Sequence, residues 1–501
     1  MTDAWLDTAP NLQQIFGCIS PLILKNCTGV KPSFFGRTMN RRDFLHSAGT
    51  MSAGLALSAS EMESARANPL GNDDPAMLDN LRRAIVDYFL KETNAQTGLI
   101  ADRTQPGSPS SIAAVGMGLS VYVVAVERGI LSRAAAIERT LRLLRFFKSS
   151  PQGPEPDATG YKGFYYHFLD MQTGRRAVQC ELSTVDSAIL LAGVLTAANY
   201  FTAENKDEKE IRDLAEFLYR RVDWKWALNG AATLTHGWQP ESGFLPYRWD
   251  TGYSEALMLY ALALGSPTFA IDPQGYHDWL KTFEWKKIYD LEYLYAGPLF
   301  IHQMSHLWID FRGIRDDFNR KVGIDYFENS RRATHAHRQY AIANPNGFAR
   351  YGEYVWGFTA SDGPGDVTLE VNGVKRTFFD YIARGAPFGP DDGTVSPWAV
   401  ATSIPFAPEI CIPTIRHAIE VLQLRTHNPY GFVASFNPTF PQKAPHLDAW
   451  MSPWVFGLNE GPILMMIENY QSELLWNVFR RCSYIVKGLQ RAGFRGGWLE
   501  K

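Results

Sequence analysis

The sequence predicts a mainly α-helical protein whose helical hairpins close into a toroid. About a dozen segments carry apolar residues at spacings of three and four, as amphipathic helices do. Long loops rich in glycine, proline and aromatic residues separate these segments, and only a few short stretches look like strands. An α-solenoid would show a repeat period, which this sequence lacks, so a mixed α+β fold is the remaining alternative.

The expected helices have local start and stop signals. Gly129 ends a small-residue helix, and Ser132 caps the next one. The helices expected in the first half of the chain cover residues 75–91, 110–128, 132–148, 184–201 and 207–222. The later helices cover residues 255–264, 276–285, 298–311, 326–340, 408–424 and 462–479. The clearest strand-like segments are residues 164–168 and 368–379.

The N-terminal region looks like an export signal. Arg41 and Arg42 precede a Phe-Leu pair, and a weakly apolar segment rich in Gly, Ala and Ser follows at residues 47–59. Ala65-Arg66-Ala67 then provides the small residues of a cleavage site. Such a twin-arginine signal is read by the bacterial machinery that exports folded proteins. The alternative is a surface arginine pair before a small helix.

This signal predicts how the chain is organised. Residues 1–38 have no place before an export signal, so we interpret them as a mis-called upstream segment with Met39 as the true start. Residues 39–67 are the expected signal peptide. Residues 68–501 are expected to form a single domain, periplasmic or secreted, and no Pro/Ser-rich linker divides them.

Composition argues against several classes of function. A net charge of −3 with interleaved signs lacks the basic block that binds phosphates, so no nucleic-acid partner is expected. After the signal, no apolar run reaches the roughly 18 residues of a membrane span. The isolated Cys180, Cys411 and Cys482 indicate neither a disulfide framework nor a zinc–thiolate site. The 14 Trp residues fit either a large aromatic core or a cleft that stacks on sugar rings.

Two acidic residues stand at expected helix starts. Asp186 lies where it completes a capping box with Ser183 or Thr184. Glu255 follows Trp249 and Tyr253 and precedes an apolar run, surroundings that raise a carboxyl pKa towards that of a general acid. Helix capping is the structural alternative for both residues.

Two loops have the composition of ligand-facing segments. Residues 346–366 place Arg350, Tyr351, Trp356 and Asp362 between glycines, without a phosphate-binding glycine motif, and we interpret this loop as a polysaccharide contact rather than a plain structural loop. Residues 446–476 begin with prolines, aromatics and carboxylates and then become a helix. The functional candidates in this segment are Asp448, Trp450, Trp454 and Glu460, although an acid and a proline are also ordinary at a helix start.

Metal and serine chemistry are poorly supported. His302 and His306 are spaced as a pair on one helix face, but Gln303 stands where the zinc-protease motif has glutamate. We therefore expect no metal and no cofactor, and interpret His302 as a sugar contact or a hydrogen-bonded core histidine. Ser403 and Ser435 lack the Gly-x-Ser-x-Gly context of a serine hydrolase.

Several motifs together resemble one family. They are Glu181-Leu-Ser-Thr-Val-Asp186-Ser-Ala, Tyr253-Ser-Glu255-Ala with Gly265-Ser-Pro267, Trp356-Gly-Phe-Thr-Ala-Ser-Asp362-Gly-Pro, Ile404-Pro-Phe-Ala-Pro-Glu409, and Gly457-Leu-Asn-Glu460-Gly-Pro-Ile463 with Ile467-Glu-Asn-Tyr470. The combination resembles the bacterial glucoamylase-like domain, typified by the endo-β-1,2-glucanases of glycoside hydrolase family 144. The similarity covers roughly residues 75–481, almost all of the expected mature chain.

The resemblance implies an (α/α)6 barrel that hydrolyses β-1,2-glucan with inversion at the anomeric carbon. Inversion needs a protonated carboxyl group and a base about 6.5–9.5 Å apart. Glu255 matches the position of the family's acid, Asp448 is the expected base, and Asp186 and Asp362 are alternatives. The residues expected to bind the sugar are Arg350, Tyr351, Trp356, Asp362, Trp249, Tyr253, His302, Trp450, Trp454 and Glu460.

One departure from the family leaves part of this expectation open. The family usually has Asp-Gln where Asn459-Glu460 stands here. Related enzymes also include transglycosylating and exo-acting, sophorose-releasing members, so the sugar class is better indicated than the product. Two other classes remain: a non-catalytic periplasmic glucan-binding protein, and a polysaccharide lyase, which needs a uronate, a neutralising Arg and a Tyr or His base.

Overall fold

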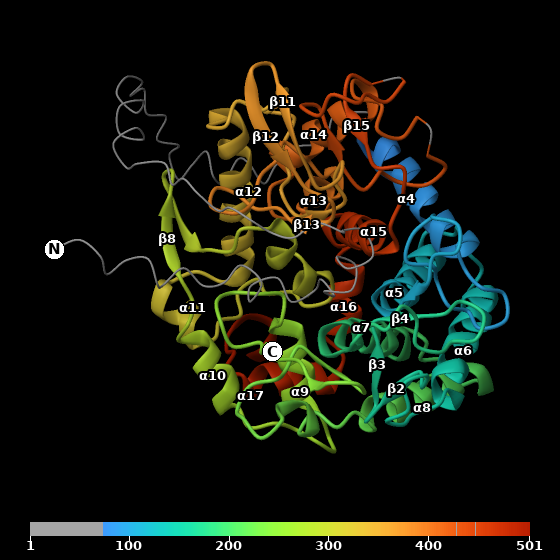
Figure 1. Cartoon of the computed structure of the whole chain (residues 1–501). Coiled ribbons are helices and arrows are strands. Elements are labelled where there is room, and N and C mark those ends of the chain that lie inside the picture. The colour runs from blue at the N-terminus through green and yellow to red at the C-terminus, as the bar shows by residue number, and fades with distance from the viewer. Residues whose placement is uncertain (1–73, 427, 446, 501) are drawn as a thin grey trace.

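The computed structural model describes residues 74–426, 428–445 and 447–500 (Figure 1). Over these residues the chain is mainly helical, and its strands are short and lie between the helices. The predicted fold class is therefore confirmed. The expected export signal lies outside the described residues and stays a prediction.

Five helices are buried along most of their length, which places them on the inside of the ring. Their sequences are apolar or small almost throughout, as a helix surrounded by protein requires. These inner helices are α5 (Ile112–Glu127), α7 (Thr184–Tyr200), α9 (Leu257–Gly265), α13 (Pro397–Thr402) and α15 (Gly457–Ser472).

The sixth position of the ring is filled by two 3-10 turns. They are η2 (Leu299–His302) and η3 (Met304–Leu307), where the sequence predicted one helix over residues 298–311. Side chains tie these turns to both neighbours. The Ser305 hydroxyl accepts a hydrogen bond from the Met258 amide of α9, and Gln303 donates to the Ala399 carbonyl of α13. Contacts from α5 to α7 to α9, and from α13 to α15 and back to α5, complete the ring.

The outer helices each carry one buried and one exposed face. They are α4 (Asp74–Lys91), α6 (Arg133–Ser149), α8 (Lys206–Arg220), α10 (Gln274–Leu280), α12 (Tyr326–Ala343), α14 (Pro408–Glu420) and α17 (Ser483–Arg491). An outer helix separates each inner element from the next along the chain. Successive inner helices therefore run in the same direction and begin at the same end of the ring, which we call the mouth.

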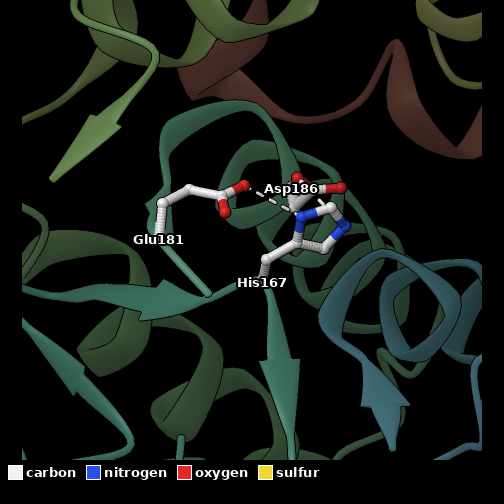
Figure 2. Close-up of side chains that lie close together, drawn as sticks. All are labelled: His167, Glu181 and Asp186. Carbon is white, nitrogen blue, oxygen red and sulfur yellow. Dashed lines mark hydrogen bonds and ion pairs between the residues drawn. The ribbon is translucent and has the colours of Figure 1, made fainter. Parts of the chain in front are cut away.

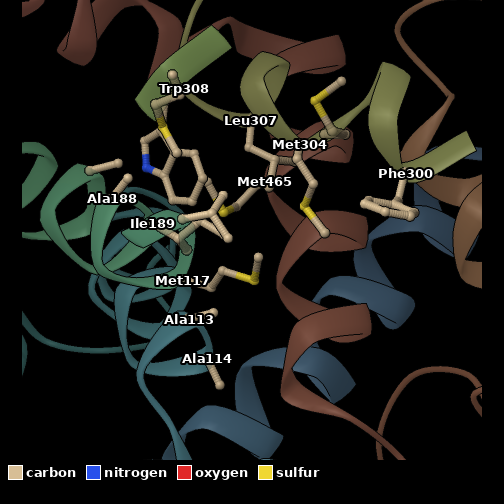
Figure 3. Close-up of a cluster of buried hydrophobic side chains, with 14 of the residues drawn as sticks. Ala113, Ala114, Met117, Ala188, Ile189, Phe300, Met304, Leu307, Trp308 and Met465 are labelled. Atoms are coloured by element: carbon tan, nitrogen blue, oxygen red, sulfur yellow. The ribbon is translucent and has the colours of Figure 1, made fainter. Parts of the chain in front are cut away.

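Apolar side chains fill the ring beyond the mouth (Figure 3). Met117 of α5, Ile189 of α7, Leu307 of η3 and Met465 of α15 meet there and are nearly or fully buried. The α5 and α7 backbones touch at two glycines, because a Cβ atom added to Gly193 would lie 2.0 Å from the carbonyl oxygen of Gly116. The centre of the toroid is thus a packed core.

Backbone bonds bring distant loops together at the mouth. The Gly457 amide at the start of α15 donates to the Asp102 carbonyl, and the Ile112 amide at the start of α5 donates to the His167 carbonyl. At the start of α7, the Thr184 amide donates to the His236 carbonyl. Side chains from segments far apart in the sequence therefore share this end of the ring.

Short strands in these loops pair with one another and hold the loops together. The one five-stranded sheet of the described chain has the order β2-β3-β5-β6-β7 and includes the predicted strand near residue 164. Its strands are β2 (Gly160–Tyr161), β3 (Phe164–Tyr166), β5 (Leu182–Ser183), β6 (Gly237–Gln239) and β7 (Gly243–Phe244). Four of the other strand pairs are β1 (Ser110–Ser111) with β4 (Phe168–Leu169), β8 (Trp285–Ile288) with β9 (Leu291–Leu294), β10 (Ala360–Ser361) with β13 (Ile382–Ala383), and β14 (Phe436–Asn437) with β15 (Trp450–Met451).

Two further expected elements are divided in the structure. The strand expected at residues 368–379 is a hairpin of β11 (Val367–Val371) and β12 (Val374–Phe378), because Asn372 and Gly373 both have positive φ, as tight hairpin turns require. The last long helix begins at Gly457 and ends where Glu473, at φ 56°, separates it from α16 (Leu474–Phe479). The short α11 (Asp317–Val322) and α13, as well as α17, were not predicted.

No helix in the described part of the chain is both long and apolar enough to span a bilayer.

Candidate active site

A histidine lies between two carboxylates at the mouth (Figure 2). His167 follows β3, Glu181 precedes β5, and Asp186 is in the first turn of α7. His167 Nδ1 is 2.9 Å from Glu181 Oε1, and His167 Nε2 is 3.7 Å from Asp186 Oδ2. All three side chains are buried. We call these residues the His167 triad.

The charges of the triad are coupled. Burial alone would lower the pKa of His167, but the carboxylates of Asp186 and Glu181 outweigh it and raise this pKa to about 9. His167 is therefore an imidazolium at neutral pH. Asp186 is fixed further by Ser183, whose hydroxyl donates to Asp186 Oδ2 at 2.5 Å and accepts from the Asp186 amide. The predicted cap of α7 is thus confirmed.

Asp102 joins this group from the loop before α5. Burial raises its pKa to about 6; Arg103 and His167 lower this pKa, and Asp362 and Asp186 raise it. The backbone of Asp102 is held by Pro109 on one side and Gly457 on the other. Its carboxylate makes no hydrogen bond or ion pair with any residue that the structure describes. Its half-buried, unpaired state is typical of a group that meets a substrate.

Asp362 approaches from β10 and its following loop. Ser452 donates to Asp362 Oδ2 at 2.9 Å, and burial raises the pKa of Asp362. Together with Asp102 and Asp186, it makes an acidic group drawn from three distant parts of the sequence. Sequence reasoning missed Asp102, His167 and Glu181, although Glu181 stands in the motif that contains Asp186.

Glu255 lies at the start of α9 and is 6 % exposed. The Ser305 hydroxyl of η3 donates to the backbone carbonyl of Glu255 and accepts from the Met258 amide. One hydroxyl therefore holds the first turn of α9 in place. Trp249 connects this region to α7, because its indole N–H donates to Thr184 Oγ1 at 3.0 Å. The structure thus places the loop that leads into α9 beside the start of α7.

The residues expected in the segment after 446 are more exposed. Asp448 is on the surface, with Lys443 Nζ 3.2 Å from its carboxylate. Trp450, in β15, and Trp454 are half-buried and offer part of their rings to solvent. Arg350 is exposed as well. The catalytic role of Asp448 and the sugar contacts of these three residues stay predictions.

The other seven expected sugar contacts are largely or wholly enclosed by protein. Glu460 and His302 are completely buried and Trp356 nearly so, while Trp249, Tyr253, Tyr351 and Asp362 are between 3 % and 9 % exposed. Each of the first three has an internal partner: the Phe432 amide donates to Glu460, the Trp356 indole donates to Thr414, and His302 bonds the Ala296 carbonyl. In this conformation Glu460, Trp356 and His302 do not offer a surface to a sugar.

Two groups bear on metal binding. The triad places one donor atom from each of its residues within 4.8 Å of the others. Both ring nitrogens of His167 face a carboxylate, an arrangement that an imidazolium satisfies without a metal. His302 and His306 contact different partners, and burial lowers their pKa values to about 4 and about 3. They are neutral core histidines.

Comparison with known proteins agrees with the fold and the motifs. Residues 246–483 match the Glycoamylase family model, described as putative glucoamylase. Over these residues the chain is similar to the glucoamylase-like family. The matched residues include the start of α9 with Glu255, the loop of Asp362 and the first turn of α15. The single-domain boundaries expected for residues 68–501 stay a prediction.

Two of the proteins that this chain is similar to are named for their action on β-1,2-glucans. An exo β-1,2-glucooligosaccharide sophorohydrolase of Parabacteroides distasonis is 27% identical over 452 residues, covering 83% of this chain. The chain spans 58% of the length of that relative. The endo-β-1,2-glucanase of Chitinophaga pinensis, solved with sophorotriose and glucose, has a TM-score of 0.74 at 25% identity, and 86% of this chain covers all of it. A putative glucoamylase of Bacteroides uniformis has the same TM-score at 29% identity, with 86% and 100% coverage.

Proposed function

We propose that this protein is a glycoside hydrolase that cleaves β-1,2-glucan. The observation that carries the proposal is the gathering of carboxylates at one end of a closed helical ring. Asp102, Asp186, Asp362 and Glu255 come from four distant segments, and each is buried or half-buried. Fold alone does not fix function, but paired carboxyl groups of this kind perform glycoside hydrolysis. The named activities of the relatives support β-1,2-glucan as the sugar.

The proposed chemistry is inversion. Glu255, as general acid, donates its proton to the glycosidic oxygen while the bond from this oxygen to the anomeric carbon breaks. A carboxylate on the opposite face takes a proton from water, whose oxygen forms the new bond to that carbon. Asp448 is the first candidate base because it is exposed on a surface segment next to Trp450. Asp186 and Asp362 are the alternatives, held by Ser183 and Ser452 respectively.

The test is to incubate the full chain with linear β-1,2-glucan beside β-1,3-, β-1,4- and α-1,4-glucans and to separate the products. Short β-1,2-oligosaccharides from the first substrate alone are expected. Release of sophorose only would indicate exo action, and a ladder of sizes would indicate endo action. Proton NMR of the first product formed reports its anomer, and the α form is expected for inversion.

Two other outcomes would replace the proposal. Binding of β-1,2-glucan by calorimetry without any cleavage would favour a glucan-binding protein. Unsaturated products that absorb at about 235 nm, formed from a uronate polymer, would favour a lyase, which removes a proton from C5 of the uronate and returns a proton to the leaving oxygen.

We also propose that the protein is exported to the periplasm through the twin-arginine pathway. The Arg41-Arg42 pair and the residues that follow it support this proposal. In a bacterial host with this pathway, the chain should reach the periplasm. The double change Arg41→Lys and Arg42→Lys should leave it in the cytoplasm, and equal export of both forms would contradict the proposal.

A further inference from the structure

The His167 triad contains more than a helix cap needs. Ser183 alone satisfies the Asp186 amide at the start of α7. Yet the structure also encloses a histidine and a second carboxylate beside Asp186, with His167 8 % exposed and Glu181 6 % exposed. Burying three ionisable groups is costly unless they compensate one another, and such groups concentrate at functional sites.

The geometry decides how the three groups share charge. A neutral imidazole has one N–H, so it could donate towards only one of the two carboxylates. Here Nδ1 faces Glu181 Oε1 at 2.9 Å and Nε2 faces Asp186 Oδ2 at 3.7 Å (Figure 2). Only the imidazolium presents a proton to both. The ring is also held from the side, since it stacks on Phe168 at 4.0 Å with planes 10° apart.

We infer that His167 is a positioning residue that fixes the Asp186 carboxylate at the mouth through a charged contact, with Glu181 holding the opposite nitrogen of the ring. This inference rests on the proposed function, in which Asp186 lies among the carboxylates of the active site. His167 acts through Asp186 and need not touch the sugar. Its backbone is anchored as well, because its amide donates to the Glu181 carbonyl and its own carbonyl accepts from Ile112 of α5.

The surrounding groups define the expected pH dependence. The ionisable groups coupled to His167 are Glu181, Asp186 and Asp102, and Asp102 is coupled in turn to Asp362 and Arg103. The pKa of His167 near 9 means that the contact persists through neutral pH and is lost as the pH rises past about 9. The activity of the wild-type protein should therefore decline on that alkaline side.

The first test is the variant His167→Gln in the full chain, assayed on linear β-1,2-glucan. It should lower kcat roughly 10- to 100-fold, because small misplacements of a reacting group have effects of this size, while KM changes less than about threefold. The alkaline decline near pH 9 should disappear. His167→Arg, which keeps a positive charge and several N–H donors, should recover part of kcat.

His236→Gln is the matched control. His236 is also buried at the mouth, but its ring stacks on Trp249 at 3.9 Å and, among the described residues, contacts no carboxylate. This variant should keep the alkaline decline. The inference is wrong if His167→Gln keeps normal kcat, or if both variants lose activity equally at every pH.

A second measurement is independent of catalysis. In isotope-labelled full chain, NMR should show the His167 ring protonated up to about pH 9, and Glu181→Gln should lower that titration point. Titration of His167 below about pH 7 would overturn the inference even if the enzyme is active. If the wild-type protein cleaves no glucan but His167 titrates near 9, the proposed function fails and the ionic triad stands. If chelation abolishes activity and a divalent cation restores it, the triad is a metal site and the inference is wrong.

Discussion

Arg384 and Asp392 form an ion pair of 2.7 Å in which neither side chain is exposed. The same guanidinium donates to the Ser361 carbonyl at 2.8 Å and to the Phe379 carbonyl at 3.1 Å. It thereby joins the residues before and after the β11–β12 hairpin. Burial would raise the pKa of Asp392, but Arg384 outweighs it and lowers this pKa. The loop that carries Asp362 is thus held by one buried cation.

Replacing Arg384 should destabilise the folded protein, because the hydrogen bonds and the ion pair of its guanidinium are lost. Arg384→Met leaves Asp392 as an unpaired buried charge and should lower the free energy of unfolding by about 3–5 kcal/mol. The double change Arg384→Met with Asp392→Leu removes both charges and should recover part of this loss. Chemical denaturation of the wild type and both variants measures the two differences. An equal loss in the single and double variants would show that the ion pair is not the cause.

Glu255→Gln tests the proposed general acid. The amide keeps the size of the side chain but cannot donate the catalytic proton, so kcat on β-1,2-glucan should fall by roughly 10²–10⁴-fold. Asp448→Asn, Asp186→Asn and Asp362→Asn, assayed in parallel, should identify the base as the one with a comparable loss. Full activity in Glu255→Gln, with an unchanged circular dichroism spectrum, would remove this residue from the mechanism.

Glu460 should make stability depend on pH. Burial raises its pKa to about 8, although Phe432 and Arg425 oppose this. The folded state therefore binds the proton more tightly than the unfolded state, whose glutamate titrates near its ordinary value of about 4.3. This contribution to stability is complete below that value and is lost as the pH rises through about 8.

The variant Glu460→Gln removes this dependence. Compared with the wild type, it should gain stability between pH 5 and pH 9, measured by denaturation at several pH values. Glu468→Gln is the control, because Glu468 lies on the same helix but is paired with Arg128 at 2.8 Å. That change should cost stability across the range. Parallel curves for the wild type and Glu460→Gln would contradict the assignment.

The close approach of α5 and α7 predicts a steric effect. In Gly193→Ala the new methyl group meets the Gly116 carbonyl at 2.0 Å, so the helices must separate, at a cost of about 1–3 kcal/mol. Gly352→Ala is the control, because its nearest neighbour is 3.9 Å away. Thermal unfolding should show a lower Tm for the first variant and little change for the second. Equal Tm values would mean that the ring yields without strain.

Local chemistry explains which elements could be predicted. Ser132 and Ser183 both accept the capping bonds that their positions predicted, and Gly129 adopts the positive φ expected after a helix. The six-residue α13 was missed because it is too short for a periodic pattern to stand out. The β11–β12 turn was missed although Asn372-Gly373 is itself a hairpin signal.

The site was only partly predictable for a different reason. Asp186 and Glu255 stand at helix starts, where the sequence itself signals their position. His167 reaches Asp186 through the pairing of β3 with β5, and Asp102 reaches it through the packing of α5 against α7. A single sequence carries no signal for such contacts. The burial of Glu460 likewise depends on Gly431 and Phe432, which come from another loop.

The two 3-10 turns η2 and η3 should make their part of the ring unfold locally more easily than the inner helices. Their amides lack the continuous ladder of an α-helix, and several depend on partners outside the turns, such as the Phe300 amide on the Thr359 hydroxyl. Amide hydrogen exchange in residues 299–307 should therefore report the loss of neighbouring segments before the five inner helices open. In this one segment of the ring, protection of the amides from exchange depends on neighbouring segments. The segment lies next to the start of α9, where Glu255 lies.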